Sequence, residues 1–379
     1  MSSKRLRVLQ FICPTGFYGA ERWILALARY LPADVSCDLA VTHEAENQDL
    51  KLVREYRSQA LGDVFELPMR HRFDTRVVTE LAGLLVDEQI DVIHTHGYKS
   101  DILGIVAARR AGIPCLVTPH GFENARDLKL RFFIWAGCRA LRHADAVAPL
   151  SRQLGDDARA AGVAEERLHY IQNGVDLGEV EAERKRPKPA TEGKRRIGFI
   201  GQLISRKNVA ELLRIFDRIH SERGGDVELL LLGDGGERVA LEALAKTLGS
   251  HGDIHFLGFR EDRLALLHSF DLFTMTSSLE GIPRCLMEAC AMGVPVAAYG
   301  IPGVDQLLEH DQTGLLAAPG DSDTLGTHWL RILNDSELAA RLGAKARLFV
   351  QEHYSAHRMA REYTALFHRL TGASQEQAA

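Results

Sequence analysis

Short apolar runs alternate with amphipathic stretches along almost the whole chain. In the first half the apolar runs predict strands at Arg7–Cys13, Cys37–Thr42, Asp91–Thr95, Cys115–Thr118, Ala146–Pro149 and Leu168–Ile171. The stretches between them predict helices at Ala20–Leu31, Arg76–Glu88, Asp101–Ala111, Leu128–Arg142 and Gln153–Ala161. Continuous apolar strands separated by helices are typical of parallel β-α-β units whose sheet is covered on both faces.

The alternation stops in a charged, proline-containing segment, Glu181–Lys194, and then begins again. Such a composition indicates a surface linker or a domain boundary. Beyond it the predicted strands are Ile197–Ile200, Val227–Leu232, Ile254–Leu257, Leu272–Met275 and Pro295–Ala298. The predicted helices are Val209–His220, Arg238–Leu248, Asp262–His268 and Leu286–Met292.

The two halves open alike, with a strand, a glycine-containing loop and a helix. The chain is therefore predicted to be an α/β protein with two Rossmann-like doubly wound parallel-sheet domains, which bind ligands at their strand C-termini. The expected divisions are a domain at 1–175, a linker at 176–196 and a second domain at 197–354. The polar tail at 373–379 is expected to be disordered.

Length and composition narrow the class of protein. The chain has 379 residues, which favours two domains, and its net charge of −5 argues against a nucleic-acid partner. No apolar run reaches the length of a membrane-spanning helix. Six cysteines occur without a C-x-x-C pair, so we expect buried free thiols in a reducing cytoplasm and no zinc site.

The segment Ser278–Val296 places two carboxylates, Glu280 and Glu288, eight residues apart around the start of a predicted helix. Pro283 suits its first position, and Gly293 suits the position after its end. The N–H groups at a helix start attract an anion, and carboxylates accept hydrogen bonds from hydroxyl groups. A sugar nucleotide fits this pattern. Spacing alone, however, favours a capping role for Glu280 and a solvated Glu288.

This segment resembles the signature E-G-[FI]-P-x4-E-A-x-A-x-G-x-P-V of retaining glycosyltransferases of family 4, and every fixed position is present. The resemblance implies a GT-B fold, in which the two domains face a deep cleft and the last helix, here 355–372, crosses back to the N-terminal domain. It also implies transfer of a sugar from a nucleoside diphosphate sugar, with UDP favoured, to a glycan, lipid-linked glycan or lipid acceptor in polysaccharide biosynthesis.

The resemblance also assigns residues of the donor site. Glu288 would bind the ribose, and Glu280 with the backbone of Gly281, Ile282 and Pro283 would hold the sugar. Arg206 and Lys207 match the family's G-R-x4-K-[GN] element, with Gln202 in place of its first arginine, and would stabilise the leaving diphosphate. Further positions near the nucleotide are Gly201, Gly233, Gly235, Phe259 and Arg260. The Phe259 ring is expected to pack in the core.

In the N-terminal half, Gly16 and Gly19 resemble the family's first glycine loop, although Ala20 replaces its second glycine. His94-Thr95-His96-Gly97 and Thr118-Pro119-His120-Gly121 end adjacent predicted strands and resemble two further elements. A lone histidine is more often structural than catalytic. The resemblance places His120 against the donor sugar, and His96 and Gly97 on the acceptor side. The expected catalytic set is therefore His120, Arg206, Lys207 and Glu280.

Some alternatives stay open. The basic, aromatic helix that begins at Arg126–Trp135 could lie against the inner face of a membrane, as in relatives with lipid-linked acceptors, or pack its aromatic side chains into the core.

No metal or cofactor is expected, since two cations and a helix start can neutralise a diphosphate and no D-x-D element occurs. A nucleotide-sugar 2-epimerase or a catalytically silent sugar-nucleotide-binding protein would share the fold. The departures at Gln202, Ala20 and Gln306 leave room for the silent protein.

Overall fold

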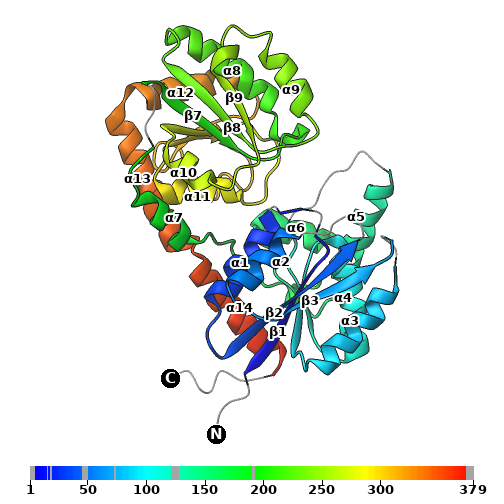
Figure 1. The fold of residues 1–379 in the computed structure, drawn as a ribbon. Coiled ribbons are helices and arrows are strands. Elements are labelled where there is room, and N and C mark those ends of the chain that lie inside the picture. Colours follow the sequence, from blue (N-terminus) through cyan, green and yellow to red (C-terminus); the bar gives the residue numbers. More distant parts are fainter. Residues whose placement is uncertain are drawn as a thin grey trace. The chain divides into compact units, whose positions relative to one another are not determined.

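The computed structural model describes residues 5–14, 16–17, 19–44, 50–71, 74–120, 128–189 and 193–372, and for residues 44 and 128–134 it describes the backbone alone. The chain forms two compact units (Figure 1). The first comprises Met1–Gly174 and Ala356–Ala379, and the second comprises Val175–Ser355. The C-terminal helix therefore belongs to the first unit.

The first unit is built on a parallel six-stranded sheet in the order β3-β2-β1-β4-β5-β6. Its strands are β1 Leu6–Ile12, β2 Val35–Glu44, β3 Val64–Met69, β4 Val92–His96, β5 Cys115–Val117 and β6 Ala146–Val147. Its helices are α1 Gly19–Tyr30, α2 Lys51–Ser58, α3 Arg76–Asp87, α4 Tyr98–Ala111, α5 Leu128–Leu141, α6 Arg152–Ala160 and α14 Ala356–Leu370. This strand order is that of a Rossmann sheet, with a switch point between β1 and β4.

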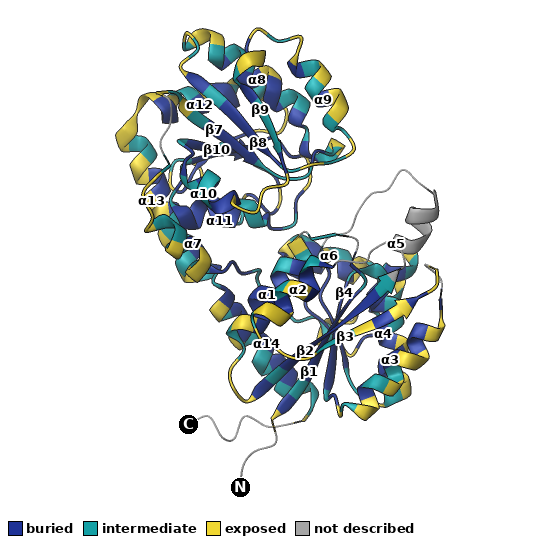
Figure 2. Ribbon diagram, viewed as in Figure 1, coloured by how far each residue is buried: buried dark blue, intermediate teal, exposed yellow. Residues whose placement is uncertain are grey.

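Helices cover both faces of this sheet. Apolar residues of α1, α2 and α14 form one core with alternate strand residues such as Val8 and Val92, and those of α3 and α4 form another with Leu9 and Ile93. Because side chains alternate along a strand, Gln10, His94 and His96 lie on the face that α1 and α14 cover. Figure 2 shows the strands as a buried layer between helices with exposed outer sides.

The second unit repeats this topology with the strand order β12-β11-β10-β7-β8-β9. Its strands are β7 Arg195–Ile200, β8 Val227–Leu232, β9 Ile254–Gly258, β10 Leu272–Met275, β11 Val296–Tyr299 and β12 Leu315–Ala317. Its helices are α7 Leu177–Arg184, α8 Val209–Glu222, α9 Arg238–Ala245, α10 Arg263–His268, α11 Arg284–Met292, α12 Ser322–Asn334 and α13 Ser336–His353. Two such sheets confirm the predicted α/β class with two doubly wound parallel-sheet domains.

Several elements differ from the prediction. The expected linker at 176–196 contains α7, whose Val180 packs into the core of the second unit, and the first residues of β7. Residues 168–171 form no strand; only Leu168 bridges to Val147. The expected disordered tail at 373–379 and the start of the basic helix at 126–127 lie outside the described residues.

Candidate functional site

The two signature carboxylates lie around the start of α11 in the second unit. The helix begins at Arg284, so Pro283 is its N-cap rather than its first residue, and Gly293 ends it in a left-handed conformation with φ of 81°. Glu280 precedes the helix in a loop, and Glu288 lies inside it. Both residues are buried: Glu280 is 7% exposed and Glu288 is 2% exposed. Neither carboxylate lies on the solvated surface, so the expectation from spacing alone that Glu288 is solvated is wrong.

Glu280 forms a buried ion pair with Lys207. Lys207 ends a short 3-10 turn, Ser205–Lys207, that follows β7. This turn is fastened to the loop before Glu280: Ser278 donates its backbone N–H to the carbonyl of Arg206 at 2.8 Å, and the Thr276 hydroxyl donates to the carbonyl of Lys207 at 3.1 Å. The expected sugar-binding carboxylate and the expected diphosphate-binding ammonium group therefore neutralise each other.

Arg206 occupies a different environment from its neighbour. Its Nε is buried and has no hydrogen-bond partner among the described residues. Within the described residues the Arg206 guanidinium forms no ion pair, whereas the Lys207 ammonium is paired with Glu280. A buried donor without a partner is costly to leave unsatisfied, so Arg206 is the cation of this loop that is better suited to receive an anionic ligand.

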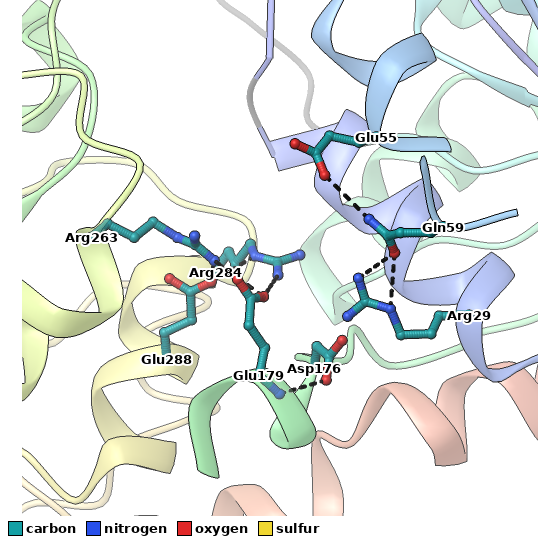
Figure 3. Close-up of polar contacts among 8 residues, drawn as sticks. All are labelled: Arg29, Glu55, Gln59, Asp176, Glu179, Arg263, Arg284 and Glu288. Atoms are coloured by element: carbon teal, nitrogen blue, oxygen red, sulfur yellow. Dashed lines mark hydrogen bonds and ion pairs between the residues drawn. The ribbon is translucent and has the colours of Figure 1, made fainter. Parts of the chain in front are cut away.

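Two arginines hold the carboxylate of Glu288, as Figure 3 shows. Oε1 accepts a hydrogen bond from Nη2 of Arg263 at 2.9 Å and another from Nε of Arg284 at 2.8 Å. Glu179, in the first turn of α7, lies 3.3 Å from Arg263 and 3.9 Å from Arg284. Asp176 caps α7 by accepting the backbone N–H of Glu179 at 3.0 Å. These contacts fix the orientation of the Glu288 side chain.

The glycine loops of the second unit have a packing requirement of their own. Gly233 follows β8 at φ of 128°, and a Cβ there would lie 1.9 Å from the carbonyl oxygen of Gly201. A Cβ at Gly235 would lie 2.3 Å from the carbonyl oxygen of Leu203. These glycines therefore allow two loops to touch, which explains their presence without a ligand.

The remaining predicted donor residues follow β9 or lie close to Glu280. Phe259 is 50% exposed, so the expectation that its ring packs in the core is wrong. The reason is that the ring lies just past the end of β9, where the sheet no longer covers it. Arg260 pairs with Asp262 at 2.7 Å, and Ile282 is buried.

A cluster of aromatic and polar side chains fills one face of the sheet in the first unit. The rings of His94, His96 and His120 lie around Trp23 of α1, with ring centroids 5.7, 5.2 and 5.3 Å from the indole. Tyr363 of α14 lies 5.2 Å from the same indole. The parallel register places Gln10 opposite His94 and Ile12 opposite His96, which brings β1 and β4 residues together.

Hydrogen bonds connect these side chains in two series. His96 Nε2 lies 2.7 Å from Oε1 of Gln10, and its Nδ1 lies 3.1 Å from Nε2 of His120. His94 Nε2 lies 2.8 Å from the Thr118 hydroxyl, which is 2.9 Å from the Tyr363 hydroxyl. Burial lowers the pKa of His94 and His96 well below the usual range and that of His120 to about 4. All three rings are therefore neutral at pH 7.

His96, which was predicted to lie on the acceptor side, is enclosed by side chains of its own unit. It is 2% exposed and both of its ring nitrogens have partners within the unit. Gly97, at φ of 98°, is the N-cap of α4, where it permits the turn from β4 into the helix. Gly19 is the first residue of α1, and Gly16 lies in the loop before it.

Sequence reasoning missed the partners of the motif residues. Arg263, Arg284 and Glu179 carry no motif signal, and Gln10, Trp23 and Tyr363 lie in patterns that predict ordinary core positions. A polar glutamine within the apolar first strand was the one available signal. Within the described ranges no group of three or more His, Cys, Asp or Glu side chains could hold a metal ion. No helix in those ranges is both long and apolar enough to cross a membrane.

Comparison with known proteins identifies the family. A model described as "Glycosyl transferases group 1" matches residues 180–349, and one described as "Glycosyltransferase Family 4" matches residues 17–179. The N-acetyl-alpha-D-glucosaminyl L-malate synthase of Bacillus anthracis is 25% identical over 80% of this chain and 81% of its own. The UDP-Gal:alpha-D-GlcNAc-diphosphoundecaprenol alpha-1,3-galactosyltransferase of Escherichia coli is 28% identical over 70% of this chain and 72% of its own.

Among solved structures, Anabaena HepE in complex with UDP has the same fold, with a TM-score of 0.80 at 20% identity, over 96% of this chain and 100% of its own. The two family models, together with this fold, define a GT-B glycosyltransferase of the group 1 type, a class that uses nucleoside diphosphate sugars. The chain belongs to glycosyltransferase family 4, and its second unit is a group 1 glycosyltransferase domain.

Proposed function

We propose that this enzyme transfers a sugar from a UDP-sugar to a hydroxyl group of a glycan, lipid-linked glycan or lipid, with retention of the anomeric configuration. The observation that carries the proposal is the start of α11. Its first turn, which begins at Arg284, follows one buried carboxylate in the chain and precedes the other, and each carboxylate is held by cationic side chains. An anion between two hydroxyl-bearing groups complements this arrangement.

In this proposal, Glu288 accepts hydrogen bonds from the ribose hydroxyls. Arg263 and Arg284 keep its carboxylate ionised and oriented. The diphosphate is bound by the N–H groups of α11 and by Arg206, whose buried Nε has no partner among the described residues. The sugar is held by Glu280 and by the backbone of 281–283.

The Lys207–Glu280 ion pair gives these two residues a joint role. A donor sugar that hydrogen-bonds Glu280 would draw on the same carboxylate that holds Lys207, and the lysine ammonium would then turn toward the diphosphate. Negative charge on the diphosphate grows as its bond to the anomeric carbon breaks, so cations placed beside it favour the transition state.

We propose the following chemical step. The bond between the anomeric carbon and the diphosphate oxygen breaks, and the acceptor hydroxyl attacks the carbon from the same face. The hydroxyl proton passes to the departing phosphate oxygen, so no protein nucleophile is assigned. Arg206, Lys207 and the helix N–H groups neutralise the leaving group, and no metal ion is assigned to that task.

Donor and acceptor classes are proposed from related proteins. The E. coli relative is named for a UDP-galactose donor and a diphosphoundecaprenol-linked acceptor, and HepE was solved with UDP. Trp135 of α5 is 58% exposed and lies beneath Arg139, whose guanidinium carbon is 5.9 Å from the ring centroid. An exposed aromatic ring beside a cation suits peripheral contact with the inner face of the membrane, where a cytoplasmic enzyme would meet a lipid-linked acceptor.

A panel of sugar nucleotides tests the donor assignment. The melting temperature of the full chain is measured with UDP, GDP, ADP and their common sugar conjugates, because a ligand stabilises the folded state by RT ln(1 + [L]/Kd). We expect uridine compounds to raise it most. No shift with any nucleoside diphosphate would contradict the proposed function.

A further inference from the structure

The turn that carries Arg206 and Lys207 ends at a residue in the left-handed backbone conformation. Asn208 has φ of 48° and ψ of 43°, values that few residues other than glycine and asparagine adopt readily. It is both the C-cap of the turn, where its N–H donates to the carbonyl of Ser205 at 3.0 Å, and the N-cap of α8. The path of the chain after Lys207 therefore depends on how Asn208 is held.

The side chain of Asn208 is held by Glu211. An asparagine at an N-cap usually accepts an N–H group of the helix that it begins, but Asn208 makes no such bond. Its amide nitrogen donates instead to Oε2 of Glu211, in the first turn of α8. A carboxylate only accepts hydrogen bonds, so this contact also fixes the orientation of the amide. A glutamate here would usually accept the backbone N–H of the N-cap, which in this chain is bonded to Ser205.

Glu211 is itself anchored to the sheet of the second unit. Its other oxygen, Oε1, accepts a hydrogen bond from the Tyr299 hydroxyl at 2.8 Å. Tyr299 is the last residue of β11 and is 2% exposed, as part of the apolar core. Burial and the bond to Glu211 raise the pKa of Tyr299 above its usual range, so the phenol keeps its proton and donates it. The Glu211 carboxylate thus joins the turn after β7 to the end of β11.

We propose that Glu211 is a positioning residue that acts through Asn208 to hold the turn in the conformation in which Arg206 and Lys207 face the leaving diphosphate. The proposal rests on the proposed function for the role of the two cations. The contacts of Asn208, Glu211 and Tyr299 lie within the second unit and depend on no ligand. Cations that stabilise charge in the transition state must be in place before that charge develops. A turn that is no longer held should therefore lower the rate rather than the affinity for the donor.

A double-mutant cycle tests the proposal by steady-state kinetics with a UDP-sugar. Glu211→Ala should lower kcat about ten-fold with little change in the donor KM, since one hydrogen bond that holds the turn is lost. Asn208→Gly removes the same bond but keeps a residue that adopts the left-handed conformation without strain. We expect Glu211→Ala to have no further effect in the Asn208→Gly protein. An equal loss in both backgrounds would overturn the proposal, because Glu211 would then act on α8 itself. An effect on KM alone would overturn it too.

Amide hydrogen exchange examines the turn without a substrate. The N–H groups of Lys207 and Asn208 donate to carbonyls at 2.9 and 3.0 Å, so they are protected while the turn is formed. In the full chain without ligand, we expect Glu211→Ala to reduce the protection factors at 205–208 about ten-fold, the effect of one lost hydrogen bond. The same change should have no effect in the Asn208→Gly protein. Unchanged protection in a folded Glu211→Ala protein would overturn the proposal.

Glu222→Ala is the matched control. Glu222 is the exposed last residue of α8, so this variant removes a carboxylate from the same helix at the end remote from the turn. We expect the kinetics and the exchange of the parent; a change equal to that of Glu211→Ala would contradict the proposal. If Glu211→Ala does not fold, Glu211→Met replaces it in the cycle, because it keeps the size of the side chain and removes both oxygens. A protein that binds no sugar nucleotide would fail the proposed function, while the exchange cycle would still decide the role of Glu211.

Discussion

Two arginines and one glutamate lie around Glu288, and none of the three occupies a fixed position of the signature that made Glu288 recognisable. The motif residues themselves could be predicted from the sequence because their order is fixed along the chain. Arg263 lies 25 positions before Glu288, and its role depends on how α10 packs beside α11. Such a contact has no period or spacing in the sequence, so sequence reasoning could not supply it.

Glu288→Ala should weaken UDP binding at least ten-fold. The ribose would lose a charged acceptor worth about 1.5–3 kcal/mol, and Arg263 would lose a partner in a buried site. Isothermal titration with UDP measures the change, and circular dichroism shows whether the variant is folded. Glu179→Gln, on the same arginines but 40% exposed at its side chain, is the control and should alter affinity little. A folded Glu288→Ala protein that binds UDP like the parent would show that the ribose lies elsewhere.

Arg206→Ala should lower kcat more than it raises KM for the donor. The diphosphate gains charge toward the transition state, so the loss of a cation beside it is felt mainly there. Steady-state kinetics with a UDP-sugar separate the two constants. Arg214→Ala, an exposed arginine of α8 bonded to the Ala210 carbonyl, serves as the control. An effect confined to KM would make Arg206 a passive anchor.

Lys207 requires a different expectation from Arg206, because the structure pairs it with Glu280. Its removal leaves a buried carboxylate without its counter-ion, so Lys207→Ala should lose stability as well as turnover. The sequence motif assigns Arg206 and Lys207 the same role at the leaving diphosphate. They are neighbours in the chain, but only the folded loop shows which of them is already neutralised.

At the scale of elements, the strands and helices that the apolar pattern predicted lie within a few residues of their expected places, including β1, β8 and α11. Helices α2, α12 and α13 and strands β3 and β12 were also not predicted, and for β3 and α7 the reason is a weak pattern. Strand β3 is an edge strand with exposed and partly exposed residues and contains Pro68, so its apolar alternation is interrupted. Helix α7 is charged and buries only Val180, which made it look like a linker.

The face of β1, β4 and β5 that holds the histidines should make folding stability depend on pH. The folded state keeps His94 neutral, since burial lowers its pKa well below the usual range, whereas the unfolded chain takes up a proton near pH 6.5. The free energy of unfolding is therefore unaffected by His94 above about pH 6.5, and it falls as the pH drops below that value, because only the unfolded chain then binds a proton at His94.

The variant His94→Gln tests this dependence. It removes the titrating group but can still hydrogen-bond Thr118. We expect the free energy of unfolding, from urea titrations at pH 7.5 and 5, to fall less between the two values in the variant than in the parent. Asp101 acts in the opposite sense, because burial raises its pKa to about 8, but it is common to both proteins and cancels in the comparison. An equal pH dependence would mean that His94 is protonated in the folded state.

For the whole molecule, the sequence predicted two doubly wound sheets and a C-terminal helix that leaves the second half, and the structure places α14 in the first unit. The second unit begins at Val175 with α7, whereas the strand–loop–helix pattern in the sequence restarts only at β7. What could not be predicted is the depth to which α14 enters the first unit, where Tyr363 is fully buried beside Trp23.

Transfer by the complete enzyme should not require a divalent cation. Arg206, Lys207 and the N–H groups of α11 are the proposed leaving-group stabilisers, so excess EDTA should leave the rate nearly unchanged and added Mg²⁺ should alter it little. The rate of UDP release measures both effects. Loss of activity in EDTA that a divalent ion restores would assign that task to the metal instead.

The position of Tyr363 has a consequence for how the enzyme is made. Its hydroxyl bonds Thr118, a residue 245 positions earlier, and the whole second unit is synthesised between them. Domains usually fold in order as the chain leaves the ribosome, but here the first unit lacks its last core helix until translation has passed residue 370. The second unit can fold before the first is complete. On a nascent chain the second unit should therefore be folded before the histidine cluster of the first unit is intact.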